Sequence, residues 1–175
     1  MSYHCGMKTP QLAFDPVEQA RQHWVDHGWA DAADGMAAVT SLMRAQQIVM
    51  GRVDAVLRGF DISFARYEVL MLLFFSSTGQ LPMRVIGSRL QVHPTSVTNA
   101  VDRLEAAGLV QRRPHPSDRR AMLVAITGTG RDIARKATDE LNDQVFTAPG
   151  ISDRQIRSLV SVLTSLREQA GDFSA

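Results

Sequence analysis

The sequence predicts a mainly helical protein with one small β-hairpin, an α+β fold class. Apolar residues recur at three- and four-residue steps through most of the chain from 16 to 170, which is typical of amphipathic helices. Two short helical patterns meet at a tight turn within 82–107, and two apolar strand-like segments, 109–110 and 122–126, follow them. A chain of 175 residues is long enough for one domain, or for one compact unit with helical extensions.

The N-terminal region predicts a tail, 1–15, followed by a helix at 16–28. Asp15 is a suitable N-cap, and Pro16 suits the first helical position because its missing N–H has no partner there in any case.

The segment 32–60 is the strongest helix in the sequence. A mainly apolar seam runs along it in alternating steps of three and four residues, with Gln46 as its one polar member. Its apolar members are Met36, Val39, Met43, Met50, Val53, Leu57 and Phe60. Such a helix would be about 40 Å long at 1.5 Å per residue, too long to be buried wholly in a small domain. It is either a long core helix or one whose face partly meets a second subunit, and we favour a mixture of both.

The rest of the chain alternates helices with turn signals. Ser63 caps one helix, Pro94 opens another, and Gly108 ends the latter as a C′ residue. The expected helices are 63–77, 82–89, 94–107, 129–146 and 152–170. The two strands are separated by a polar loop that contains Pro114, Pro116 and Ser117.

The net charge of +1 is small, but the positive charge is concentrated. Residues 112–120 contain four arginines and one histidine against a single acid, Asp118. One basic edge on an otherwise neutral protein favours a localised contact with nucleic acid.

Composition also argues against several classes of protein. No apolar run approaches the roughly 18 residues of a membrane span, and the N-terminus has no signal pattern, so no membrane contact and a cytoplasmic location are expected. The single cysteine, Cys5, rules out an internal disulfide and is either an inert thiol or a redox sensor. The sequence offers no catalytic constellation, no histidine spacing for a metal and no cofactor motif, so we expect none of these.

The exposed face of the helix at 94–107 is polar and almost uncharged. It carries Thr95, Ser96, Thr98, Asn99 and Arg103. Hydroxyl and amide groups of this kind can contact base edges and phosphates, although any surface helix has a polar face.

The loop that follows strengthens the nucleic-acid interpretation. Arg119 and Arg120 suit a minor groove, whose negative potential attracts guanidinium groups, and Asp118 would orient a nearby arginine. The alternative is a solvated charged turn. Helix and basic hairpin together favour double-stranded DNA.

Two stretches carry a family resemblance. The run DRRAMLVAIT at 118–127 resembles the D-x-R-x-x-x-V-x-L-T wing signature of the MarR family of winged-helix transcriptional regulators, with Ile126 in place of leucine. VHPTSVT at 92–98, followed by VDRLEAAGLV at 101–110, is similar to the recognition helix and strand entry of that family. The resemblance covers roughly 32–170. It implies a winged helix-turn-helix lobe on a helical dimerisation base, a homodimer, a pseudo-palindromic operator, and Arg120 as the main wing contact.

The resemblance also implies a small aromatic or anionic ligand that releases the DNA. The extra helix at 16–28 resembles a urate-responsive subgroup, from which this chain departs by having Glu68 and Ala100 where the subgroup has another acid and an arginine. The candidate ligand residues are Trp24, Trp29, Met43, Arg44, Tyr67 and Glu68; for the two tryptophans and Tyr67 the alternative is ordinary packing.

These observations lead to one functional hypothesis: a dimeric, sequence-specific regulator, more a repressor than an activator. The alternative is a winged-helix protein-interaction module. The expected division is an N-terminal tail and helix (1–31), a dimerisation region (32–60 and 129–175) and a DNA-binding domain (61–128). The expected DNA contacts are Thr95, Ser96, Thr98, Asn99, Arg103, Arg113, His115, Asp118, Arg119 and Arg120.

Overall fold

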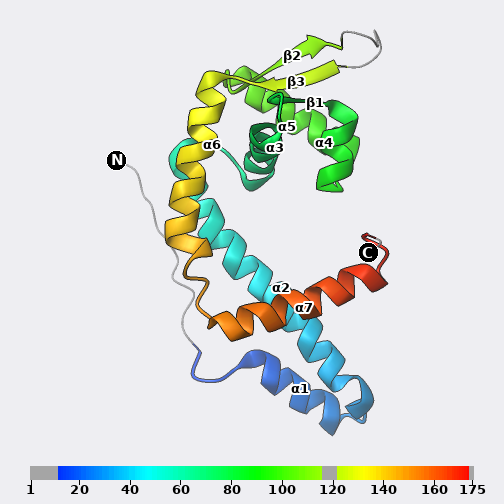
Figure 1. Ribbon diagram of the computed structural model, residues 1–175. Coiled ribbons are helices and arrows are strands. Elements are labelled where there is room, and N and C mark those ends of the chain that lie inside the picture. Colours follow the sequence, from blue (N-terminus) through cyan, green and yellow to red (C-terminus); the bar gives the residue numbers. More distant parts are fainter. Residues whose placement is uncertain (1–11, 116–121, 174–175) are drawn as a thin grey trace. The chain divides into compact units, whose positions relative to one another are not determined.

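The computed structural model describes residues 12–115 and 122–173, which form mainly helices and one small antiparallel sheet (Figure 1). The predicted fold class is therefore confirmed. The helices are α1 (Pro16–Asp26), α2 (Ala30–Leu57), α3 (Phe64–Phe75), α4 (Met83–Leu90), α5 (Pro94–Ala106), α6 (Gly128–Leu141) and α7 (Asp153–Gln169). The strands are β1 (Gln80–Pro82), β2 (Val110–Pro114) and β3 (Met122–Ile126). The chain divides into two compact units, 1–51 and 52–175.

The first unit contains α1 and most of α2. Asp15 caps α1 as predicted, because the backbone N–H of Val17 donates to its carboxylate at 2.9 Å. Gly28, at φ +84°, lies in the turn before α2. Along α2 the apolar side chains of this unit are largely exposed, and Val39 and Met43 are each about 60% exposed.

The second unit holds the hydrophobic core. It is built from the end of α2, the helices α3 to α6 and the sheet. The side chains of Leu57, Leu70, Leu73, Ile86, Leu104 and Leu141 are almost fully buried. Val97, Val101 and Leu104 form the buried stripe of α5, as their spacing predicted.

The sheet has three strands in the order β1-β3-β2, where the sequence predicted only a hairpin. β1 pairs with β3 through Leu81 opposite Val124, in a segment predicted to be loop and helix start. Three residues are too few to show a periodicity of two. β2 also continues to Pro114, well beyond the predicted Val110, because Arg112 and Arg113 pair with β3.

The predicted helix at 129–146 is α-helical only to Leu141, after which residues 142–146 form a π-helical turn. The backbone N–H of Thr147 donates to the carbonyl of Asn142 at 3.0 Å. The Arg52 guanidinium donates to the carbonyls of Gln144, Ala148 and Pro149 at 2.9–3.2 Å, and so holds the turn before α7. None of the helices that the structure describes is long and apolar enough to cross a membrane.

Candidate nucleic-acid interface

Local sequence and core packing fix the position of α5. The backbone N–H of Thr95 donates to Nδ1 of His93 at 3.3 Å, and Pro94 occupies the first helical position. The buried stripe locks the inner face of the helix, and Gly108, at φ +70°, allows the chain to turn into β2. The outer face is therefore presented by a rigid element.

The polar residues predicted for DNA contact on α5 all lie on this outer face. Thr95, Ser96, Thr98, Asn99 and Arg103 are exposed. The Thr98 hydroxyl donates to the carbonyl of Pro94 at 3.1 Å, which leaves its oxygen available as an acceptor. The Arg103 guanidinium makes no hydrogen bond or ion pair with the described residues.

One edge of α5 is tied to the hairpin. The backbone N–H of Arg112, on β2, donates to Oε1 of Glu105 at 2.9 Å, and its guanidinium bonds both Glu105 and Asp102. These bonds hold the pKa of Glu105 below its usual value, the backbone N–H contributing most. Arg112 thus differs from what the basic cluster in the sequence suggested: its charge is compensated, and it braces β2 against α5.

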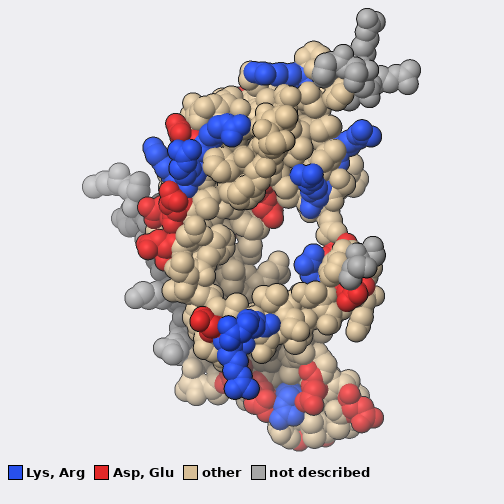
Figure 2. Space-filling view, viewed as in Figure 1, with Lys and Arg blue, Asp and Glu red and all other residues tan. Residues whose placement is uncertain are grey.

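Of the other residues predicted for DNA contact in the hairpin and its loop, only some are among the residues that the structure describes. Arg113 is exposed on β2 and His115 is half-buried just beyond that strand. Asp118, Arg119 and Arg120 lie outside the described residues, as does Cys5. Figure 2 shows basic side chains over the hairpin and over α4 of the second unit.

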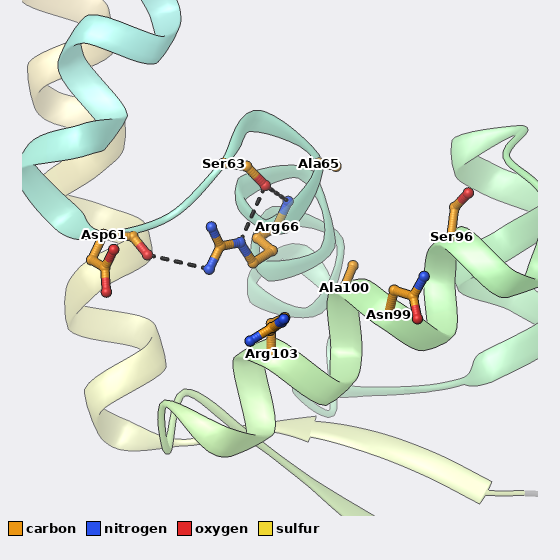
Figure 3. A pocket seen from close by; sticks show the side chains of 8 residues that line it. All are labelled: Asp61, Ser63, Ala65, Arg66, Ser96, Asn99, Ala100 and Arg103. Carbon is orange, nitrogen blue, oxygen red and sulfur yellow. Dashed lines mark hydrogen bonds between the residues drawn. The ribbon is translucent and has the colours of Figure 1, made fainter.

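A polar groove opens along the other edge of α5 (Figure 3). It encloses about 470 Å³ and is lined by Asp61, Ser63, Ala65, Arg66, Ser96, Asn99, Ala100 and Arg103. The Arg66 guanidinium is anchored there, because it donates to the Ser63 hydroxyl at 3.2 Å and to the Asp61 carbonyl at 3.3 Å. The groove thus places two arginines, one from α3 and one from α5, on facing walls.

The DNA contacts predicted from the sequence include three residues of the α5 wall of this groove, Ser96, Asn99 and Arg103, and none of its α3 wall. Ser63 was predicted only as a cap, which it is, since it accepts from the backbone N–H of Arg66 at 3.5 Å. The available signal was an arginine in the first turn of a helix, where a cation is unfavourable unless it serves another purpose.

A second, apolar groove of about 380 Å³ lies on another face of α3. Its lining residues are Phe64, Tyr67, Glu68, Met71, Leu72, Phe75, Leu90, Thr138 and Phe146. The hydroxyls of Tyr67 and Thr138 are hydrogen-bonded at 3.0 Å. Partial burial raises the pKa of Glu68.

The structure thus places two of the six candidate ligand residues, Tyr67 and Glu68, in one groove. The other four lie in the first unit. There the rings of Trp24 and Trp29 meet edge to face at 5.4 Å, while Met43 is exposed and Arg44 donates to Gln47.

Comparison with known proteins identifies relatives that are transcriptional regulators. A family model described as the MarR family matches residues 60–121. Sco5413 of Streptomyces coelicolor, a MarR family transcriptional regulator, is 48% identical, covers 81% of this chain and 99% of its own, and superposes with a TM-score of 0.74. Sco3205 of the same organism, a MarR family regulator solved in complex with DNA, is 24% identical over 78% of this chain and 88% of its own, with a TM-score of 0.70.

A curated relative extends the comparison beyond that genus. YhbI of Bacillus subtilis (strain 168), an uncharacterized HTH-type transcriptional regulator, is 28% identical over 126 residues, which are 70% of this chain and 80% of YhbI. Because nearly half of the aligned residues match Sco5413 over almost the whole of that protein, this chain belongs to the MarR family of transcriptional regulators.

Proposed function

We propose that this MarR-family regulator binds a pseudo-palindromic operator in double-stranded DNA as a homodimer, acts in the cytoplasm as a repressor, and is released by a small ligand. The observation that carries the proposal is the outer face of α5: polar, exposed, and held rigid by a buried stripe on one side and the Arg112 brace on another. A rigid polar helix next to a basic hairpin suits a major groove and its neighbouring minor groove.

Individual roles follow from the chemistry of each side chain. Thr95 and Asn99, at the outermost positions of α5, suit base edges, since an amide can donate to and accept from adenine. Ser96, Thr98 and Arg103 suit bases or phosphates. Further contacts are assigned to the hairpin and its loop, through Arg113, His115, Asp118, Arg119 and Arg120.

Exposed apolar side chains support the homodimer. In the first unit they lie along α2, and in the second they lie along α7, which has no buried residue. On α7 they are Leu159, Val160, Val162 and Leu166, of which Val162 is 66% exposed. Apolar surface of this density marks an interface.

The apolar groove supports an aromatic ligand. Phe64, Tyr67 and Phe75 line it with aromatic rings, and Tyr67 and Thr138 add two hydroxyls that are hydrogen-bonded to each other. Among the described residues that line it, Glu68 is the one carboxyl group and none is a lysine or an arginine. The aromatic part of the proposed ligand class is therefore better supported than the anionic part.

The test is a binding titration against the DNA immediately upstream of the coding sequence. We expect binding that unlabelled operator displaces and scrambled DNA of the same length does not, and we expect Asn99→Ala to reduce this preference. Binding that scrambled DNA displaces equally well would favour a protein-interaction module instead.

A further inference from the structure

A helix in a major groove has a sugar-phosphate strand on each side. Under the proposed function, the hairpin lies beside the DNA strand on one side of α5. At 3.6 residues per turn, Thr98, Asp102 and Glu105 share the edge of α5 that faces the hairpin, and Arg112 closes that edge. The opposite edge, where a second phosphate strand would pass, carries Ser96, Ala100 and Arg103 and opens on the polar groove.

The charges in the polar groove suit an anion. The ionisable groups that the described residues contribute to it are two guanidiniums and the Asp61 carboxylate, which together carry a net positive charge. Arg66 is pre-positioned by its bonds to the Ser63 hydroxyl and the Asp61 carbonyl, while Arg103 has no partner among the described residues. Figure 3 shows both guanidinium groups at the same end of the groove, with the side chains of Ser96 and Asn99 further along it.

We infer that this groove binds a backbone phosphate of DNA on the side of α5 away from the hairpin, with Arg66 and Arg103 as its two cations. Arginine suits this role because its planar fork bonds phosphate oxygens in pairs. Arg66 thereby extends the DNA-binding surface from the recognition helix to α3. The inference rests on the proposed DNA binding.

The test measures the affinity of Arg66→Gln for an operator duplex and for a scrambled duplex across a series of KCl concentrations. Glutamine keeps a donor for Ser63 while removing the charge. A phosphate contact carries no sequence information, so both duplexes should bind more weakly by a similar factor, on the order of tenfold. The slope of log affinity against log salt should fall by about 1 for each protomer that contacts DNA.

Two further variants complete the design. Arg66→Lys should retain part of the affinity and the full salt slope, because the charge remains. Arg135→Ala removes an exposed arginine of α6 that lies outside the groove, and should leave the affinity and the slope unchanged. Thermal unfolding of each variant separates loss of contact from loss of fold.

The outcomes distinguish this inference from the function on which it rests. If Arg66→Gln binds both duplexes with the affinity and the salt slope of the wild type, the inference is overturned, while the proposed DNA-binding function stands. If the wild type binds no duplex, the proposed function fails. A saturable stabilisation by inorganic phosphate at constant ionic strength that is lost in Arg66→Gln, while DNA binding is unaltered, would assign the groove to a free anion and overturn the backbone contact.

Discussion

The two grooves share one helix and differ in almost everything else. The polar groove takes Ala65 and Arg66 from α3, while the apolar groove takes Tyr67 and Glu68, the next residues in the chain. Arg66 carries a charge held at the surface by local hydrogen bonds, whereas Tyr67 is only 7% exposed. One turn of α3 thus serves both the proposed DNA contact and the proposed ligand site, so a ligand that moves this turn also moves Arg66.

The largest effect is expected from a change in the buried face of α3, the helix that contributes residues to both grooves. Leu70 lies on the inner face of α3 with no exposed surface. Leu70→Ala should lower the free energy of unfolding by about 2–5 kcal/mol and should impair both grooves together. Urea unfolding measures the loss. Phe75→Ala, at a side chain 75% exposed, is the matched control and should cost far less; equal losses would mean that the core does not hold α3.

Next in size is a change that should affect one groove alone. Arg103→Ala is expected to weaken operator binding by about 1–3 kcal/mol, because it removes from the proposed DNA-binding surface a cation that has no side-chain partner among the described residues. Binding of a neutral apolar dye in the other groove should be unchanged. Phe146→Ser should weaken binding of the dye and leave operator binding unchanged. Fluorescence anisotropy of labelled operator measures DNA binding, and dye fluorescence measures binding in the apolar groove. Loss of both signals in either variant would show that the two grooves do not function independently.

A smaller effect should distinguish the brace from the groove. Arg112→Met should weaken operator binding by about 1 kcal/mol, since Asp102 and Glu105 would then be left uncompensated beside the proposed phosphate contacts. The salt slope, however, should remain that of the wild type, because Arg112 does not itself neutralise a phosphate. A slope that falls as in Arg66→Gln would contradict the assignment of Arg112 as a brace.

The smallest effect concerns Glu68. Because burial raises its pKa in the folded protein, its charged form opposes folding above that pKa. Glu68→Gln should therefore stabilise the protein at pH 7, by less than about 1 kcal/mol because the group is partly solvated. The gain should disappear as the pH falls below the usual glutamate value of about 4.3. Thermal unfolding at several pH values tests this, with the exposed Glu168→Gln as the control; a gain that persists in acid would exclude the explanation.

Local signals in the sequence were sufficient for α5. The spacing of Val97, Val101 and Leu104 predicted which side is buried, and Pro94 and Gly108 predicted both ends, because each depends only on neighbours along the helix. The roles of the polar residues on the outer face remain predictions. The division of the chain into a dimerisation region and a DNA-binding domain also remains a prediction.

Features that depend on distant parts of the chain could not be predicted in the same way. β1 forms because β3 presents an open edge, and not because three residues prefer a strand. Arg112 is neutralised because the register of β2 places it beside Glu105. Arg66 and Arg103 line the same groove only because α3 packs on α5, and no periodicity in the sequence shows that they lie in one groove.

The contacts of Arg52 depend on the shape of its guanidinium as well as on its charge. Its guanidinium supplies donors to three carbonyls at the end of the π-helical turn, where a helix terminus leaves such groups without partners. A lysine keeps the charge but lacks the planar fork that reaches several acceptors at once. Replacing Arg52 with lysine would therefore leave carbonyl groups without donors in the segment between α6 and α7.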